Sequence, residues 1–412
     1  MNSLPKQQQS YWKESTPKHT YKPVNKDITV DVAIVGGGIT GLTTAYLLKQ
    51  SGLQVAVLEK NTIGSGTTGS TTGKVTSQHN LIYADIQKHL GKESARLYAT
   101  ANQSAIERIQ EIIKKEKIDC GWQRQDNYVY TTDPKKVKQF KKEAHVAKSL
   151  GLPASFETQL ALPFHVEAAV KFTNQAYFNA KKYTVGLSQA VHGQGSSVFE
   201  HSNVTSFRDG NPATVGVGTS TVTARYIVVA TKIPAFPLLA RFGYGALEYP
   251  HTSYLVAGEY EGTLRGMYVS PDKGQYSILP VQEGGKNLLF VGGENHIPGL
   301  GLPFRRHQKL ATYAQKHFGV SPITYRWKAM DYLAYDKMPL VGKVYPWSKH
   351  LYTATGFKKW GLSTSMVAAT ILHDMILDKP NPYADLFKST RFRPVASIPG
   401  VIGNGVKKYL TT

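Results

Sequence analysis

The chain has 412 residues, of which 41% are hydrophobic and 19% charged, with 37 Gly and 21 Pro. This length fits one large domain or two interleaved domains around a sizeable core, and the composition excludes a fibrous or a wholly disordered protein. The formal net charge of +21 favours anionic ligands but does not choose among small acids, nucleic acid and membrane surfaces.

The cysteine count and the N-terminus indicate a compartment. A single cysteine, Cys120, excludes an internal disulfide, a thiolate zinc cluster and an iron–sulfur centre of the Rieske or ferredoxin type. The first nine residues lack the apolar core of a signal peptide, and no run of about 20 apolar residues is present. We therefore expect a cytoplasmic protein without a metal site or a transmembrane segment.

Ordered structure is predicted to begin near residue 28. Residues 1–27 are polar and hold three prolines, which predicts an extended arm. Residues 29–35 are typical of a strand buried on both faces, residues 39–51 have helical spacing, and residues 54–58 are again strand-like. This pattern predicts a βαβ unit.

A glycine motif lies between the first strand and the helix. Gly36, Gly38 and Gly41 form Gly-x-Gly-x-x-Gly, and Glu59 ends the next strand. The first glycine permits a tight turn, the second lets backbone N–H groups approach a pyrophosphate, and the third lets the helix pack on the strand. The Glu59 carboxylate suits ribose hydroxyls and disfavours the 2′-phosphate of NADP. These residues predict a site for FAD or NAD.

The sequence after Glu59 favours FAD. Residues 61–80 form a Gly, Thr and Ser loop that is long enough to wrap a pyrophosphate and reach an isoalloxazine ring. Residues 225–231 form a strand that ends in Ala-Thr, as in flavoproteins of this type, although Lys232 replaces their glycine. Residues 352–363 are a strand, a glycine turn and a helix start, which directs N–H groups at a flavin that becomes anionic on reduction.

Further elements surround these motifs. Amphipathic helices are predicted at residues 94–117 and 134–149, and another helix at residues 364–377. Strand-like segments with turn residues between them predict an antiparallel sheet at residues 254–260, 266–270, 275–281 and 287–292.

These motifs resemble the D-amino-acid oxidase-like family of FAD-dependent oxidoreductases, the group of glycine oxidase, sarcosine oxidase and D-amino-acid dehydrogenase. The resemblance covers residues 31–377, and residues 176–183 and Val204 also follow the family's order. Other segments are similar to a bacterial branch that usually carries a C-terminal Rieske domain, namely residues 10–12, 67–76, 292–296 and 356–361. That domain does not follow here, so we expect that it was lost or that the chain is part of a longer protein.

The resemblance implies an α/β fold, with a Rossmann-like FAD-binding domain of discontinuous segments and an interleaved α+β substrate domain built on an antiparallel sheet. The implied boundaries are an arm at 1–27, the FAD-binding domain at 28–90, 175–235 and 335–380, the substrate domain at 91–174 and 236–334, and a C-terminal extension at 381–412. The implied residues for noncovalent FAD are Gly36, Gly38, Ile39, Thr40, Gly41, Glu59, Lys60, Gly66, Thr67, Thr68, Thr72, Gly73, Lys74, Val75, Val204, Ala230, Thr231, Lys232, Gly356, Lys359, Trp360, Gly361, Leu362 and Ser363.

The resemblance also implies a reaction, in which a hydride leaves the carbon next to the nitrogen of a small amine or amino acid and O₂ or a redox protein accepts the electrons. Lys74 is expected beside the isoalloxazine as a cation that stabilises the reduced ring. Tyr254 and Tyr276 are candidates to hold a substrate carboxylate, and His296 lies at a strand end near the site. Each has an ordinary alternative: a solvated lysine, a core tyrosine or a structural histidine.

Other side chains have structural interpretations. Residues 305–307 are expected to be a solvated basic loop, while Asp331 and Asp336 are expected to pair with Arg326. A covalent flavin bond at His79 is disfavoured because the surrounding pattern is absent.

Two other functions stay open at this stage. One is an electron-transfer subunit for a separate iron–sulfur partner. The other is a basic flavoprotein that acts on RNA, although the chain carries no motif for specific nucleic-acid binding. The oligomeric state is not predicted.

Overall fold

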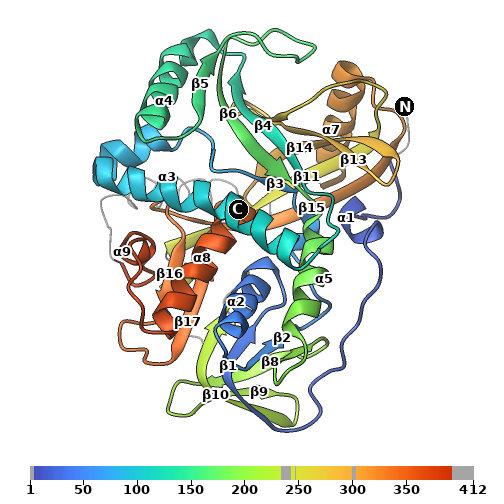
Figure 1. Cartoon of the computed structure of the whole chain (residues 1–412). Helices are drawn as coiled ribbons and strands as arrows, with labels where there is room; N and C mark the ends of the chain where they lie inside the picture. Colours follow the sequence, from blue (N-terminus) through green and yellow to red (C-terminus); the bar gives the residue numbers. More distant parts are fainter. Residues whose placement is uncertain (1–3, 233–242, 246, 299–302, 392–412) are drawn as a thin grey trace.

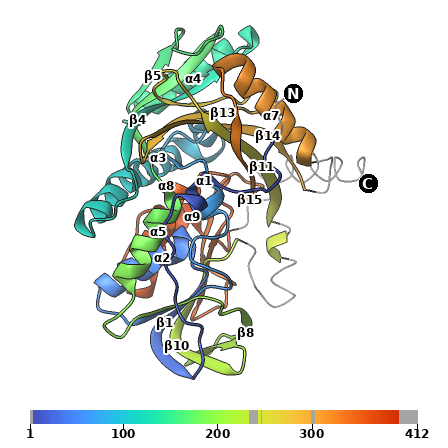
Figure 2. The ribbon, with the colours of Figure 1, turned by 90° about the vertical axis from the view of Figure 1, so that its right-hand side faces the viewer.

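Two sheets organise the chain, one above the other in Figure 1, and the long helix α3 (Tyr83–Lys115) crosses at their boundary. The structure is a computed structural model that describes residues 4–232, 243–245, 247–298 and 303–391. Figure 2 shows the same two layers from the side. The α/β fold class with a Rossmann-like unit is therefore confirmed.

The lower sheet has a parallel centre, in which β17, β10, β1, β2 and β7 lie side by side in that order. Strand β16 pairs antiparallel with β17, while β9 joins β10 and carries β8. The strands are β1 (Ile28–Val35), β2 (Val55–Leu58), β7 (Ser197–Phe199), β8 (Val204–Arg208), β9 (Ala213–Val217), β10 (Ser220–Val229), β16 (Leu340–Lys343) and β17 (Leu351–Thr355). Segments far apart in sequence thus build one sheet.

The predicted βαβ unit is present as β1, α2 (Ile39–Gln50) and β2. Gly36 has φ +111°, a conformation that side chains rarely adopt. At Gly41 an added Cβ would lie 2.0 Å from the carbonyl oxygen of Gly36. Helix α2 therefore packs on the turn as closely as the third glycine of the motif allows.

The upper sheet runs in the order β15, β11, β14, β13, β12, β4, β6 and β3, with β5 beside β6. Its pairs are antiparallel as expected, except that β12 and β4 are parallel. These two strands come from distant segments, so no hairpin fixes their direction. The strands are β3 (Lys74–Val75), β4 (Gln123–Thr131), β5 (Ala154–Glu157), β6 (Ala168–Tyr177), β11 (Glu248–Glu259), β12 (Met267–Val269), β13 (Ser277–Glu283), β14 (Lys286–His296) and β15 (Ile323–Ala334).

Helices cover both sheets. Helix α2 contacts α5 and α8 beside the lower sheet, and α7 packs on β11 and β14 of the upper sheet (Figures 1 and 2). Helix α3 begins earlier than predicted because the chain passes through a kink at Gly91 rather than a loop. The remaining helices are α4 (Val137–Ser149), α5 (Ala180–Val191), α7 (Pro303–Phe318), α8 (Gly361–Ile376) and α9 (Ala384–Phe387), with 3₁₀ turns η1 (Thr68–Ser70) and η2 (Pro134–Lys136).

The N-terminal arm is more ordered than its polar composition predicts. It contains the one-turn helix α1 (Tyr11–Glu14), in which Tyr11 and Trp12 are buried. The Trp12 Nε1 donates to the Thr71 carbonyl oxygen over 2.9 Å, and its ring packs on Phe290, with ring centroids 4.9 Å apart. Two aromatic side chains thus anchor the arm between the upper sheet and the loop of residues 61–80, which we call the Thr-rich loop.

The predicted pairing of Arg326 with Asp331 or Asp336 is wrong. Arg326 instead donates to the carbonyl oxygens of Pro5 and Lys6, so the arm occupies its guanidinium. Asp336 pairs with Arg391 at 2.6 Å. In the predicted C-terminal extension, α9 is partly buried in the core. Residues 392–412 of this extension lie outside the described residues. The same holds for residues 236–242 of the predicted substrate domain.

Candidate functional site

A cavity of about 750 Å³ lies between the two sheets. We call it the central cavity. Its wall combines the β1–α2 turn, the Thr-rich loop, the ends of β10 and β17, and part of the upper sheet. The expected site residues that line it are Gly36, Gly38, Ile39, Thr40, Glu59, Lys60, Gly66, Thr67, Thr68, Thr72, Lys74, Val204, Ala230, Thr231, Lys232, Tyr254, Gly356, Lys359, Trp360, Gly361 and Leu362.

Four expected cofactor residues are not part of the wall. Gly41 holds α2 against the turn, and Val75 lies in the core. Gly73 has φ +92°, and an added Cβ there would meet the Phe178 carbonyl oxygen at 2.8 Å. Ser363 lies 3.0 Å from Nε2 of His79. These residues support the wall from behind.

Two of the expected catalytic residues also lie outside the wall. Tyr276 turns towards α7, where its ring stacks on Tyr313 with centroids 3.8 Å apart. His296 stacks on Tyr254 with centroids 5.6 Å apart. The structure therefore brings Lys74 to the central cavity. Tyr254 also lines it, but its ring packs with His296 and against His307 of α7, while Tyr276 and His296 do not line it.

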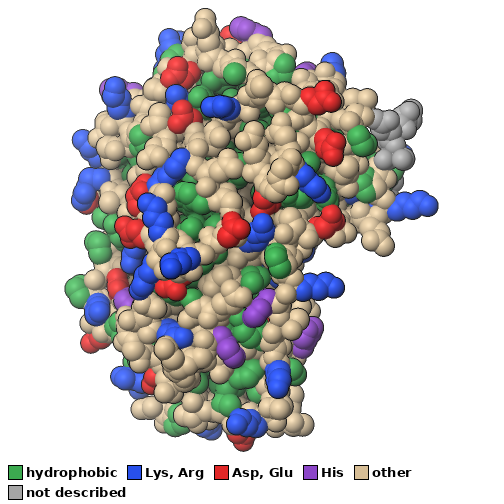
Figure 3. Space-filling view, turned by 45° about the vertical axis from the view of Figure 1, so that its right-hand side comes forward, with side chains coloured by type: hydrophobic (Ala, Val, Ile, Leu, Met, Phe, Trp, Pro, Cys, Tyr) green, Lys and Arg blue, Asp and Glu red, His purple; other side chains and the backbone are tan. Residues whose placement is uncertain are grey.

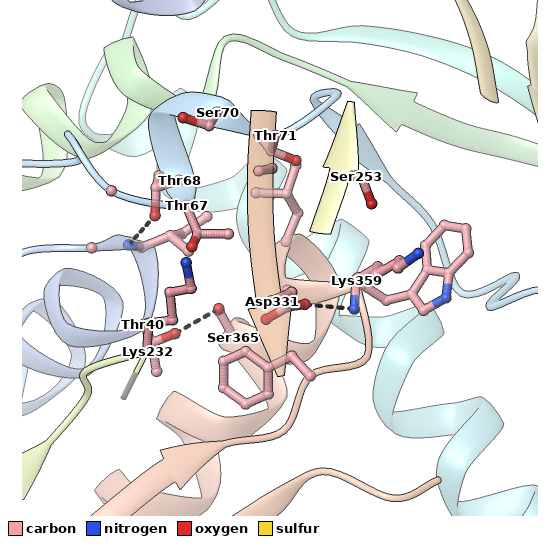
Figure 4. Close-up of a pocket in the computed structure, with 18 of the residues that line it drawn as sticks. Thr40, Thr67, Thr68, Ser70, Thr71, Lys232, Ser253, Asp331, Lys359 and Ser365 are labelled. Atoms are coloured by element: carbon pink, nitrogen blue, oxygen red, sulfur yellow. Dashed lines mark hydrogen bonds between the residues drawn. The ribbon is translucent and has the colours of Figure 1, made fainter. Parts of the chain in front are cut away.

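Helices α2 and α8 both begin at the central cavity. Their N-cap residues, Gly38 and Trp360, make no side-chain capping hydrogen bond. The Thr68 hydroxyl accepts from the Ile39 N–H over 3.1 Å, and the Thr40 and Ser365 hydroxyls join the two helices over 2.8 Å (Figure 4). Helix N-termini carry partial positive charge, so two positions of the wall favour anionic groups.

Backbone groups orient Glu59 at the end of β2. Its Oε2 accepts from the Gly37 N–H at 2.7 Å and its Oε1 from the Asn61 N–H at 2.8 Å. A carboxylate has about four acceptor positions, so lone pairs remain for ligand hydroxyls.

Lys74 is buried in the wall, with 5% of its surface exposed. Its Nζ donates to the Tyr268 carbonyl oxygen over 2.7 Å and lies 2.8 Å from Ser277 Oγ. Among the described residues no carboxylate lies within 4.0 Å of this nitrogen. Burial alone lowers the pKa of Lys74 well below its ordinary value.

The turn before α8 is held by two carboxyl groups, the half-buried Asp331 and the buried Glu248, which the sequence did not single out for this role. Asp331 accepts from the Lys359 backbone N–H at 2.6 Å (Figure 4), and Glu248 lies 3.1 Å from the Thr355 hydroxyl. Burial raises the pKa of Glu248 to about 8 and lowers that of the Lys359 ammonium to about 7. Both carboxyls lie on upper-sheet strands but act on the turn at the end of β17.

His79 lies behind Trp360, and the two rings are stacked with centroids 5.1 Å apart. Its Nδ1 is 2.6 Å from the Tyr98 hydroxyl, and its Nε2 is 2.8 Å from the Thr76 carbonyl oxygen. Burial lowers the pKa of His79 to about 3, which leaves the ring neutral. Both nitrogens are therefore engaged within the protein.

Neutral polar side chains on the cavity wall were missed by sequence reasoning. Most come from the upper sheet and its turns, and they are Asn80, Ser253, Ser270, Gln275, Ser277 and Asn295. Their residue types are common on any strand, so only the nearby Tyr254 and His296 pointed to these segments.

Figure 3 shows how the charged side chains are distributed on one face of the molecule. On the face shown in Figure 3, Lys and Arg side chains are interspersed with Asp and Glu rather than gathered in one stripe. In the described part of the chain, no helix is long and apolar enough to cross a membrane, and no group of three His, Cys, Asp or Glu side chains is arranged to hold a metal ion.

The central cavity fits FAD. At Gly36 a Cβ would fill the space against the Ala230 carbonyl oxygen at 2.7 Å, so the turn requires glycine. The N-terminus of α2, where the N-cap Gly38 has no side chain, suits a pyrophosphate, and Glu59 suits ribose hydroxyls. The N-terminus of the second helix, α8, suits a further anionic group on the same ligand.

Comparison with known proteins supports the assignment of FAD to this chain. The family model described as FAD dependent oxidoreductase matches residues 31–375. The putative Rieske 2Fe-2S iron–sulfur protein YhfW of Bacillus subtilis is 34% identical over 391 residues, which cover 93% of this chain and 76% of that protein. Gamma-glutamylputrescine oxidoreductase of Escherichia coli is 24% identical, covering 89% of this chain and 88% of that protein.

A solved structure shares the fold. Glycine oxidase from Geobacillus kaustophilus superposes with a TM-score of 0.76 and 20% identity, over 89% of this chain and 99% of that one. The family match spans both sheets and most of the residues that line the central cavity. The chain therefore belongs to the DAO family of FAD-dependent oxidoreductases, and FAD is its cofactor.

Proposed function

We propose that this enzyme oxidises a C–N bond of a small amine or amino acid. The observation that carries the proposal is the upper-sheet wall of the central cavity, where Lys74 lies among neutral polar residues that include Ser270 and Ser277. Relatives named gamma-glutamylputrescine oxidoreductase and glycine oxidase support an amino compound as the substrate.

In this reaction the residues of the chain bind the ligands, orient them and exclude water. The α2 N-terminus and Glu59 would hold the nucleotide end of FAD, and the turn before α8 would hold its other end. Bound FAD would supply the acceptor for the hydride that leaves the carbon next to the substrate nitrogen. Lys74 offers a hydrogen-bonding group to a substrate in the central cavity, and at this buried position such an interaction is stronger than in water. The Tyr254 ring packs instead against His296 and His307.

Anaerobic mixing of the holoenzyme with amines, D- and L-amino acids and N-methyl amino acids tests the proposal. We expect at least one compound to bleach the flavin absorbance. If none of these compounds bleaches it while dithionite does, the proposed substrate class is wrong.

A second candidate function is an electron-transfer flavoprotein that passes electrons to a separate iron–sulfur protein. The name of the Bacillus subtilis relative, of which the chain covers 76%, favours it. Admitting air after bleaching separates the two acceptors. Rapid return of the yellow colour indicates O₂, and a flavin that stays reduced indicates a protein acceptor.

We predict that the FAD is held without a covalent bond. Both ring nitrogens of His79 form hydrogen bonds within the protein, and His79 does not line the central cavity. Acid precipitation should therefore release the yellow colour into the supernatant. Colour that stays with the denatured pellet would contradict this, and peptide mapping would then begin at His79.

Replacing Glu59 with glutamine should weaken FAD binding by about 1–3 kcal/mol, because the neutral amide loses charge-assisted hydrogen bonds. Titration of the apoprotein by flavin fluorescence measures the change in Kd. The matched control is Glu261→Gln, at an exposed position away from the central cavity. Equal Kd values for the Glu59 variant and the wild type would remove Glu59 from the ribose site.

A further inference from the structure

Lys74 is the cavity group whose chemistry is least explained by cofactor binding. It lies on β3, a two-residue strand that belongs to the upper sheet through its pairing with β6. The amine is buried, lacks a carboxylate partner among the described residues, and reaches the central cavity. A buried lysine in such a place is either a costly unpaired cation or a neutral amine.

The hydrogen-bond geometry suits a neutral amine with one open position. An amine nitrogen has three positions besides its Cε bond, and the Tyr268 carbonyl oxygen and Ser277 Oγ take two of them. In the neutral form two N–H groups meet these oxygens and the lone pair is the third position. In the protonated form the third position is an N–H, which can donate a hydrogen bond to an anion or a neutral amine.

The groups around Lys74 do not supply a countercharge. Burial raises the pKa of Tyr177 on β6, which pairs with β3, and of Tyr268 on β12, whose carbonyl oxygen accepts from Lys74, so both phenols are uncharged. Asp331 does not pair with Lys74. Its carboxylate accepts from the backbone N–H of Lys359, just before α8. Burial therefore lowers the pKa of Lys74 without opposition.

The proposed reaction needs a proton acceptor. An alkylamine has a pKa near 10, so at neutral pH only about one molecule in a thousand has the nitrogen lone pair that must assist the departure of the hydride. An enzyme that binds only this neutral form therefore reacts about a thousandfold more slowly at a given total substrate concentration.

We propose that Lys74 is the catalytic base that takes the proton from the substrate's ammonium group. The Lys74 lone pair forms the new N–H bond, the substrate N–H bond breaks, and its electron pair stays on the substrate nitrogen. The products are a neutral substrate amine and a protonated Lys74, so charge and atoms balance without another reactant. The inference rests on the proposed function, and it also explains when Lys74 becomes the cation expected from the sequence.

The first test needs no turnover. Lysine labelled with ¹³C at Cε is introduced into the holoenzyme, and the Lys74 signal is identified by its absence in Lys74→Met. We expect the Lys74 signal to have the chemical shift of a neutral amine at pH values where exposed lysines such as Lys286 are charged. A Lys74 signal that titrates with the bulk of the lysines would overturn the proposal, whether or not a substrate is known.

The second test uses a compound that bleaches the flavin. In the wild type, the bleaching rate constant divided by the substrate Kd should be independent of pH over about two units below the substrate pKa, because the ammonium form is productive. In Lys74→Met the same ratio should fall about tenfold per pH unit below that pKa. Lys74→Arg keeps a cation that cannot accept a proton, so it should show the same slope as Lys74→Met.

Two controls separate catalysis from structure. Lys286→Met removes an exposed lysine from the same sheet and should retain the wild-type profile. Ser277→Ala keeps the amine and should retain a flat profile at a lower rate. If Lys74→Met lowers the ratio equally at every pH, Lys74 is structural. If no amino compound bleaches the wild type, the proposed function fails while the labelled lysine still decides the state of Lys74.

Discussion

Gly41→Ala is expected to prevent stable FAD binding and to destabilise the fold by more than about 3 kcal/mol. The added Cβ would lie 2.0 Å from the Gly36 carbonyl oxygen, and this neighbour is backbone that cannot rotate away. Helix α2 would have to move off the turn, which displaces the N–H groups that hold the pyrophosphate. Thermal unfolding and the ratio of flavin to protein absorbance measure both effects.

Gly243→Ala is the matched control for this substitution. Among the described residues, no atom lies within 4 Å of a Cβ added at Gly243, and its φ is not positive. Its alanine variant should keep the wild-type melting temperature and flavin content. A Gly41→Ala protein with both properties unchanged would mean that α2 does not approach the turn as closely as described.

Trp12→Ala is expected to cost about 3–5 kcal/mol and to weaken FAD binding as well. Only 1% of the Trp12 surface is exposed, and its Nε1 fixes the Thr71 carbonyl oxygen in a loop that lines the central cavity. Trp12→Phe keeps much of the packing but loses the hydrogen bond, so about 1 kcal/mol is expected. Denaturant unfolding and FAD titration measure the two consequences.

Trp347 provides the comparison for the arm. It is 70% exposed, so Trp347→Ala should change stability by no more than about 0.5 kcal/mol. If Trp12→Ala is equally harmless, the N-terminal arm does not anchor the loop, and the extended arm expected from composition is the better description.

Local patterns predicted the nucleotide half of the molecule. The Gly36 turn, α2 and Glu59 lie within one continuous βαβ unit, where spacing alone determines which backbone groups meet. The same holds for the strand–turn–helix at β17 and α8. Such features depend on neighbours in sequence, so a single chain reveals them.

The upper-sheet wall depends on contacts that no local pattern contains. The two partners of Lys74 lie 194 and 203 residues further along the chain. Ser277 reaches the cavity while Tyr276, one residue earlier, turns to α7, and alternation alone does not say which face of a strand is which. Residues 10–12 were singled out only by similarity to the bacterial branch, because two aromatic residues have no period from which the burial of Trp12 could be predicted.

The measurement that tests the central claim most directly is the product balance of a single anaerobic turnover. A compound that bleaches the flavin is mixed in slight excess with the holoenzyme, and the products are quantified after denaturation. Oxidation of a C–N bond, followed by hydrolysis of the imine, predicts one carbonyl compound and one ammonia or amine for each FAD reduced. Bleaching that yields a product with a new C=C bond and an intact C–N single bond, and no imine, carbonyl compound or released ammonia, would contradict the account.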